Sequence, residues 1–545
     1  MSMARHVRSL MCVSLLSVSS TVAAIAASVS TTPASTAPLS PAAKQWWADI
    51  AAIANDGMEG RLTGSAGYMR ASQYVISRFK AEGLAPAGTE GFMQPVAFTQ
   101  QLIDQNASTL ELTAADGSVV PLNAGRDSRI GAGGAPAPDS IDAPLVFVGY
   151  GLHLPRQGAD DFAGMDLQGK IVVVLSGGPA EISGPIKSSA RFERAQQLGK
   201  LGALGLVTLT TPKQTEIPWS RQILLASQPG MYLEDASLRE TPDGFVTLGL
   251  DPAKSDVLFA GSGHTFAELC ALADASKPVP TFALPYRLKG HLVVKRERLS
   301  SPNLVAEMRG RDLKLAQQFV VISAHLDHLG VGAPINGDTI YNGAMDDASG
   351  VATVLDIAHR LKHGPKPRRS ILFLIVTAEE KGLLGSHYFA RHPTVPKDGI
   401  VADLNFDMPL PLWPLTKVLV PGEDESTLGA DARAVAAERR LDVAPDALPD
   451  RNVFIRTDQF SFVREGIPAL AFKFGFAKDT PEFQIEHDWR ANRYHAPSDD
   501  LDQPVMKEEA VKLDAYVAAL AARVANADER PAWLPTSIFR PQPAP

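Results

Sequence analysis

Two adjacent glutamates, Glu379 and Glu380, follow an apolar run in the segment LIVTAEEKGLLGS. Neighbouring carboxylates repel each other, and burying either one is costly unless a cation or a proton compensates its charge. Because the residues before the pair are typical of a buried strand, we expect a positive group beside it. A metal ion held jointly by other parts of the chain would be such a group.

Four other stretches place His or Asp at the end of an apolar run or beside glycine, namely ISAHLDHLG, NGAMDDASG, DLNFDMP and NRYHAPSDD. In open α/β sheets, ligands gather outside the carboxyl ends of the strands, so these stretches can converge. Zinc enzymes commonly use three protein ligands per metal, and two metals about 3.5 to 4 Å apart need a bridging ligand. That requirement is met by five residues that would hold two Zn²⁺ ions with one shared carboxylate: His325, Asp346, Glu380, Asp407 and His495.

The segments that carry these residues alternate between strand-like and helix-like patterns. The runs QFVVISAHLDHLG and SILFLIVTAEE are typical of strands, and SGVATVLDIAHRLKHG has helical spacing. Strands that alternate with helices indicate a parallel, helix-covered sheet. We therefore predict the α/β class, with a mostly parallel mixed sheet sandwiched by helices.

Residues 131–290 differ from the rest of the chain, because short β-like runs are separated there by Gly, Pro and Asp. A length of 545 residues also exceeds what one hydrophobic core usually supports. We predict a main domain in two parts, residues 44–130 and 291–530, around an inserted β-rich domain at 131–290.

The first 27 residues carry Arg5 and Arg8 ahead of an apolar stretch that ends in small residues. This pattern predicts a signal peptide at 1–27 and an exported protein, periplasmic or secreted, without a stable membrane anchor. The alternative is a membrane anchor, although the run is short and rich in Ser and Ala. Residues 28–43 are expected to be a linker and 531–545 a Pro-rich tail.

The charge balance disfavours two classes of partner. The formal charge is -8 with a pI near 5.9, and no dense Lys/Arg block occurs, so neither nucleic acid nor anionic membrane is expected as a partner. Once the signal is removed only Cys270 remains, so we predict no intrachain disulfide.

Five motifs in one order, AHLDHLG, GAMDDASGVA, TAEEKGLLGS, NFDM and YHAPSDD, resemble the secreted co-catalytic di-zinc aminopeptidase family. Relatives of that family include glutamate carboxypeptidase and the transferrin-receptor ectodomain. The resemblance covers roughly residues 300–500 and extends more loosely to EGRLTGSAGY. It implies a zinc exopeptidase-like fold. The segments VGYGL, DLQGKIVVV and KLGALGLVTL of the inserted region resemble a protease-associated domain.

The resemblance also implies a role for each matched residue. Asp346 would bridge the two zinc ions, with His325 and Asp407 on one ion and Glu380 and His495 on the other. Asp327 would orient the His325 imidazole. Glu379 would be the general base, so that one glutamate of the pair binds metal while its neighbour moves a proton.

Other residues near these motifs have simpler interpretations. His328 is expected near the site without binding metal, and Asp347 at a helix start. Asp458 matches a family segment that often reads Ser-Asp-His, but Gln459 stands here in place of the histidine, which puts a role of this position in doubt. Tyr494 is expected to pack beside the site.

The function expected from these residues is hydrolysis of the N-terminal residue from peptides with a free N-terminus. The ligands and Glu379 leave the site slightly negative, which suits an α-ammonium group. The alternatives are a carboxypeptidase or dipeptidase of the same family, a glutaminyl cyclase, or a receptor-like binding protein without catalysis. A carboxypeptidase needs cations for the substrate carboxylate, and four arginines near the ligand-bearing stretches are candidates: Arg451, Arg456, Arg490 and Arg493.

Overall fold

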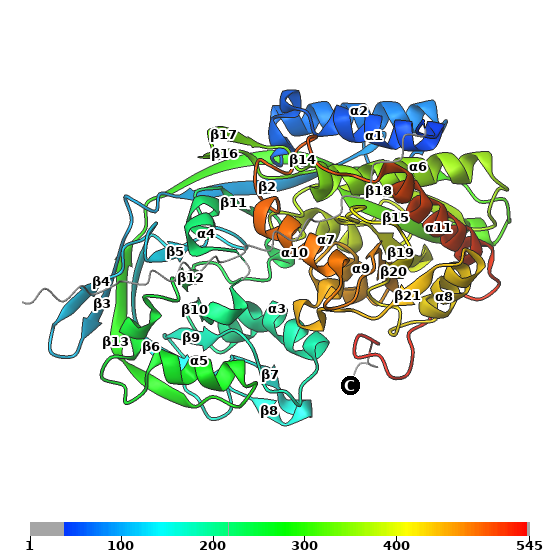
Figure 1. The fold of residues 1–545 in the computed structure, drawn as a ribbon. Helices are drawn as coiled ribbons and strands as arrows, with labels where there is room; N and C mark the ends of the chain where they lie inside the picture. The colour runs from blue at the N-terminus through cyan, green and yellow to red at the C-terminus, as the bar shows by residue number, and fades with distance from the viewer. Residues whose placement is uncertain (1–37, 216, 542–545) are drawn as a thin grey trace, which may run out of the picture. The chain divides into compact units, whose positions relative to one another are not determined.

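The main sheet joins a parallel half to an antiparallel half (Figure 1). The computed structural model describes residues 38–215 and 217–541. In spatial order the strands are β11 (Gly230–Leu233), β2 (Met93–Ile103), β14 (Val294–Met308), β18 (Ser370–Val376), β15 (Phe319–His325), β19 (Ile400–Asn405) and β22 (Ala469–Ala471), with β1 (Ala85–Pro86) paired to β14. Strands β18, β15, β19 and β22 are mutually parallel, so their carboxyl ends share one edge.

Both faces of the main sheet are covered by helices. Alternate residues of the central strands enter different apolar cores, Ile322 and Phe373 on one side and Val321 and Leu372 on the other. The first core includes residues of α1 (Pro41–Ile53), α2 (Ala66–Ala81), α6 (Ser349–His363), α8 (Leu428–Glu438) and α11 (Lys507–Asn526), and the second includes residues of α7 (Leu384–Arg391) and α9 (Gln459–Arg464). The predicted α/β class, a mixed sheet between helices, is confirmed.

A second sheet has its own apolar core. Its order is β4 (Val119–Pro121), β3 (Thr109–Ala114), β13 (Thr281–His291), β6 (Ser140–Val148), β9 (Ile171–Leu175), β10 (Gly205–Leu209), β12 (Val246–Leu250) and β5 (Ser128–Ile130). Helices α3 (Gly184–Lys200) and α5 (Phe266–Asp274) contribute to this core. This sheet draws on residues 109–291, while β11, from the same stretch of chain, pairs with β2 of the main sheet.

The remaining named elements are short, apart from one helix. They are β7 (His153–Leu154) with β8 (Ala159–Asp160), β16 (Gly330–Ile335) with β17 (Asp338–Tyr341), β20 (Lys417–Leu419) with β21 (Asp442–Ala444) and β23 (Lys473–Phe474), and the helices α4 (Trp219–Leu225) and α10 (Pro481–Asn492). Across residues 38–215 and 217–541, none of the helices has the length and apolarity needed to span a membrane.

The structure describes only part of the predicted terminal segments. The predicted signal peptide and most of the predicted linker lie outside the described residues. Helix α1 begins at Pro41, inside the expected linker, because the Ser40 hydroxyl accepts a hydrogen bond from the Ala43 amide and proline is favoured in a first helical turn. In the Pro-rich tail, the Trp533 indole donates to the Gly466 carbonyl at 2.8 Å.

Candidate metal centre

The predicted ligands gather at the carboxyl-terminal edge of the parallel strands. His325 is the last residue of β15, Glu380 follows the end of β18, and Asp407 follows the end of β19. Asp346 comes from the turn directly before α6, and His495 follows α10. Segments far apart in the sequence therefore deliver ligand-type side chains to one place, as the shared edge of parallel strands favours.

Two groups of possible metal ligands share Asp346. His325 and Asp407 complete the first group, and His328 and Glu380 the second; within each group one ligand atom per residue lies within 4.8 Å of the others. His325 Nε2 lies 3.2 Å from Asp346 Oδ1, whereas His328 Nδ1 lies 4.0 Å from Asp346 Oδ2. A carboxylate that turns one oxygen toward each group has the arrangement of a bridging ligand.

The second group has two imidazoles beside it. His495 Nε2 lies 3.3 Å from Glu380 Oε2 and 3.4 Å from Asp346 Oδ2. His328 Nδ1 lies 2.7 Å from the other Glu380 oxygen, Oε1. The sequence assigned His495 to this position and expected His328 to lie near the site without binding metal. The structure brings both side chains to Glu380, and the motif HLDHLG, with two histidines at the end of one strand, is the signal for the second.

Asp346 is held by a residue that the sequence interpretation did not assign. The Asp499 carboxylate accepts hydrogen bonds from the backbone amides of Met345 at 2.9 Å and Asp346 at 3.0 Å. Gly343, which precedes this turn, has φ +61°, and a Cβ there would lie 2.6 Å from the His328 ring. Only glycine therefore allows the turn and the imidazole to pack this closely.

Asp327 makes different contacts from those expected. Its carboxylate lies 3.9 Å from His325 Nδ1, while its backbone carbonyl accepts from this ring nitrogen at 3.0 Å. The carboxylate instead accepts the backbone amides of Glu379 at 3.1 Å and Glu380 at 3.3 Å. The backbone carbonyl of Asp327 thus contacts the imidazole, and the carboxylate is left to hold the backbone of the glutamate pair.

Strained backbone is concentrated beside the ligands. Ala378, which precedes the glutamate pair, has φ +56°, and Met408, which follows Asp407, has φ +48°. His495 itself has φ +54°. Left-handed conformations at non-glycine residues are rare and are typical of functional sites.

The donor set fits metal ions. Five buried atoms of these residues lack a hydrogen-bond partner: His325 Nε2, both ring nitrogens of His328, Glu380 Oε1 and Asp407 Oδ1. The contacts of 2.7 Å and 3.2 Å given above therefore do not have the geometry of hydrogen bonds, although the atoms are close. Leaving such groups unpaired in a protein interior costs roughly 1–3 kcal/mol each. Imidazole and carboxylate atoms that converge without bonding to each other are the ligands that zinc prefers.

Burial and the neighbouring charges raise the pKa of Glu379, which is the direction useful for proton transfer. Burial, and then the carboxylates of Asp407 and Glu380, raise the pKa of Glu379 well above its usual value, against the opposing effect of His325. A carboxylate with a raised pKa is a stronger base when ionised, which suits an acceptor of protons near neutral pH.

Of three neighbouring residues, Asp347 and Tyr494 have contacts that explain their presence, and Asp458 does not. Asp347 accepts the Gly350 amide at 2.9 Å and so caps the start of α6, as expected. The Tyr494 ring stacks on His495 with centroids 3.9 Å apart. Asp458 is buried without a hydrogen bond to either carboxylate oxygen, and burial raises its pKa to about 7.

Three of the four arginines considered for a substrate carboxylate have internal partners. Arg451 contacts Glu486 at 2.8 Å, and Arg490 donates to the same carboxylate. Arg493 donates to the Ser498 carbonyl. The positive charges of these three arginines are therefore already engaged within the protein, whereas Arg456 is exposed and makes no ion pair among the described residues.

Arg61, from the EGRLTGSAGY stretch, lies buried beneath the ligand-bearing turns. Its guanidinium donates to the carbonyls of Leu326 at 2.7 Å, Asn342 at 2.5 Å and Gly343 at 2.9 Å, and also to that of Ile53. Burial lowers the pKa of Arg61 to about 10. One side chain thus ties the residue after His325 to the turn that precedes Asp346.

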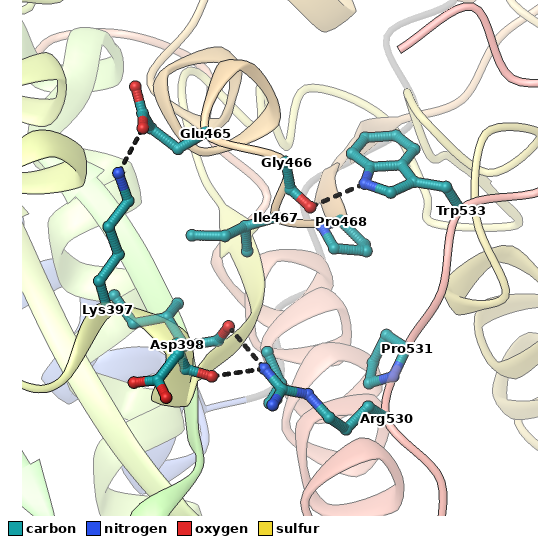
Figure 2. A pocket seen from close by; sticks show the side chains of 11 residues that line it. Lys397, Asp398, Glu465, Gly466, Ile467, Pro468, Arg530, Pro531 and Trp533 are labelled. Carbon is teal, nitrogen blue, oxygen red and sulfur yellow. Dashed lines mark hydrogen bonds and ion pairs between the residues drawn. The ribbon is translucent and has the colours of Figure 1, made fainter. Parts of the chain in front are cut away.

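A separate cavity lies away from these ligands (Figure 2). It has a volume of about 560 Å³ and is lined by residues 397–401, 465–468 and 530–533, none of which belongs to the predicted site. Figure 2 shows Lys397 paired with Glu465, and Arg530 directed at the carbonyls of Asp398 and Ile400. Lys397, Glu465 and Arg530 thus bind to each other or to the backbone, and none of the metal-ligand groups of the described residues lies in this cavity.

Comparison with known proteins points to the same part of the chain. The family described as "Peptidase family M28" matches residues 303–521. The chain is 35% identical over 115 residues to "probable leucine aminopeptidase 2" of Aspergillus oryzae, which covers 21% of each protein. It is 27% identical over 226 residues to "Probable lipoprotein aminopeptidase LpqL" of Mycobacterium tuberculosis, which covers 37% of this chain and 42% of that one.

Among solved structures, an aminopeptidase from Aneurinibacillus sp. strain AM-1 superposes with a TM-score of 0.52 at 20% identity and covers 90% of this chain and 95% of that one. This likeness concerns the fold. The chain spans only about a fifth of the length of the first of the two relatives and less than half of the second.

Proposed function

Residues 303–521 belong to peptidase family M28, and from this premise we propose that the protein is a zinc-dependent aminopeptidase that hydrolyses the N-terminal residue from peptides. The observation that carries the proposal is the pair of ligand groups that share Asp346, with Glu379 beside them. A co-catalytic pair of metal ions requires two ligand groups that share one bridging carboxylate.

Each zinc ion has an assignable set of ligands. His325, Asp346 and Asp407 would hold one ion, and Asp346, Glu380 and His495 the other, with His328 as a further candidate for the second ion. Bound zinc would lower the pKa of a water ligand toward neutrality and polarise the scissile carbonyl. Zinc content after His328→Gln and after His495→Gln tests this: loss of one equivalent in the second variant only is expected, and the reverse result would exchange the two roles.

Glu379 would take up a proton from the attacking water and deliver it to the nitrogen of the leaving amine. Its raised pKa supports this role. Asp327 would position the pair of glutamates through their backbone amides. The surplus of carboxylates around the ligands favours a substrate with an α-ammonium group. Arg451, Arg490 and Arg493 are engaged, which leaves Arg456 as the one remaining candidate of the four for binding a substrate carboxylate.

We also propose that the protein is exported, on the evidence of the signal-like residues 1–27. N-terminal sequencing of the protein recovered outside the cytoplasm should give a start near Ala27. An intact Met1 on exported protein would contradict the signal peptide.

Substrate blocking tests the aminopeptidase proposal. Purified protein with zinc is offered one short peptide in three forms: free, N-acetylated and C-terminally amidated. We expect the free and amidated forms to be hydrolysed at similar rates and the acetylated form to be resistant. Loss of hydrolysis on amidation, with the acetylated form cleaved, would establish a carboxypeptidase instead. Cyclisation of an N-terminal glutamine without hydrolysis would identify a glutaminyl cyclase, and no turnover of any form would favour a binding protein.

A further inference from the structure

A second set of metal-ligand side chains lies at the other end of α6. His359 and His363 are four residues apart on the last turns of this helix, and Glu82 follows the end of α2. One ligand atom from each of these three residues lies within 4.8 Å of the other two. Histidines at positions i and i+4 share one face of a helix, which is the spacing of helical zinc-binding motifs.

The contacts join the three side chains closely. His359 Nδ1 lies 3.1 Å and 3.2 Å from the two Glu82 oxygens, and His363 Nδ1 lies 3.8 Å from Glu82 Oε2. Ligands about 2 Å from one tetrahedral metal are roughly 3 to 4 Å apart, so little movement is needed to enclose an ion. His363 Nδ1 also lies 2.9 Å from the His359 carbonyl. A carbonyl accepts from a protonated Nδ1, so this contact orients the ring and leaves Nε2 as the nitrogen of His363 that can bind a metal.

The surroundings favour a cation at this position. The side chains of His359 and His363 are 53% and 62% exposed, so an ion can enter from solvent, while Glu82 is 12% exposed and held in place. The C-terminal ends of α2 and α6 lie together here, as the hydrogen bond of 2.8 Å from the Lys362 amine to the Gly83 carbonyl shows. Both helix ends carry partial negative charge.

We propose that Glu82, His359 and His363 form a peripheral site for one divalent late transition-metal ion, of which Zn²⁺, Ni²⁺ and Cu²⁺ are the best matches to two imidazoles and a carboxylate. The ion would link the ends of α2 and α6 and leave positions for water. This inference does not rest on the proposed peptidase activity. The competing interpretation is a surface ion pair between Glu82 and protonated histidine, which needs no metal.

Zinc binding by the untagged full chain distinguishes the proposed metal site from a surface ion pair. Equilibrium dialysis against micromolar Zn²⁺, followed by metal analysis, is applied to the wild type, to the double variant His359→Gln/His363→Gln and to His392→Gln. The control histidine is 50% exposed and belongs to none of the metal-ligand groups of the described residues. We expect the double variant to bind one equivalent less than the wild type, and the control to bind as the wild type does. Equal zinc binding by wild type and double variant would overturn the site.

A second measurement does not depend on counting zinc at the buried centre. On immobilised Ni²⁺, the wild type and the control should elute at a higher imidazole concentration than the double variant, and Glu82→Gln should elute between them. Elution of the double variant with the wild type would overturn the proposal, as would elution of Glu82→Gln with the wild type. Unchanged peptide hydrolysis in the double variant would show that it is folded.

Discussion

The two ends of α6 each gather imidazoles and carboxylates, but in opposite environments. Before its first turn, Asp346 joins His325 and Asp407, which are 3%, 0% and 6% exposed. In its last turns, His359 and His363 are more than half exposed. Bulk water can satisfy the exposed set, whereas the buried set has little access to it. We therefore expect a metal ion to contribute less to the stability of the folded state at the exposed end of the helix than at the buried end.

The largest effect should come from the glutamate pair at the buried end. Glu379→Gln keeps the size of the side chain but removes its ability to accept a proton, so kcat should fall by about 100- to 10,000-fold while two zinc ions are retained. Parallel measurements of kcat and zinc content check this.

The matched control is Glu380→Gln, which changes the neighbouring carboxylate. A neutral amide is a poor zinc ligand, so this variant should lose metal, and added zinc should partly restore activity. If Glu379→Gln loses zinc and Glu380→Gln keeps it, the two roles are exchanged. If neither variant loses activity, the pair is structural.

The next effect should come from Arg61, which ties together the turns of the buried end. Arg61→Met leaves buried carbonyls without a donor, and charge-assisted hydrogen bonds contribute roughly 1.5–3 kcal/mol each. We expect the free energy of unfolding in urea to fall by about 3 kcal/mol or more. Arg70→Met is the control, because Arg70 is 45% exposed and pairs with Glu59, an interaction of about 1 kcal/mol or less. Equal losses in the two variants would refute the bracing role of Arg61.

How far sequence could predict this site depends on which contacts are local. Residues at the ends of parallel strands converge for a general reason, so the gathering of His325, Glu380 and Asp407 could be expected from pattern alone. Asp499 and Arg61 act on backbone groups of Asp346 and Leu326 that are distant in sequence. No periodicity or spacing encodes such pairings.

The same limit applies to the fold. The apolar runs of β15 and β18 predicted buried strands, and the helical spacing of residues 349–363 predicted α6. The pairing of β11 with β2 depends on a contact between remote segments that has no local signature. The start of α1 at Pro41 differs from the prediction for another reason. Ser40 is a typical N-cap residue and is followed by proline, so the sequence does contain a local signal for this helix start, although the predicted linker extends to residue 43.

The smallest effect on stability is expected from a buried carboxylate beside the middle of α6. This carboxylate tests the effect of burial where no metal ion is proposed. Asp514 of α11 faces Asp356 of α6, is fully buried, and has no hydrogen-bond partner for either carboxylate oxygen. The ligands near the start of the helix have imidazoles beside them, whereas Asp514 belongs to none of the metal-ligand groups of the described residues. Burial, and then the charge of Asp356, raise the pKa of Asp514 well above its usual value.

The sign of the pH effect follows from linkage. An unfolded aspartate loses its proton near pH 4, whereas Asp514 in the folded protein keeps its proton to a higher pH, so between these two values the unfolded state binds fewer protons and stability falls as pH rises. Asp514→Asn removes this dependence. We expect the variant to match the wild type near pH 4 and to exceed it by about 1 kcal/mol or more at pH 8, in urea unfolding at constant zinc. Asp424→Asn, at an 89% exposed carboxylate, should change stability by less than about 0.5 kcal/mol at both pH values. A stability gain for Asp514→Asn that is the same at pH 4 and pH 8 would show that the carboxyl does not titrate between the two, and the contrast along α6 would then not extend to its middle.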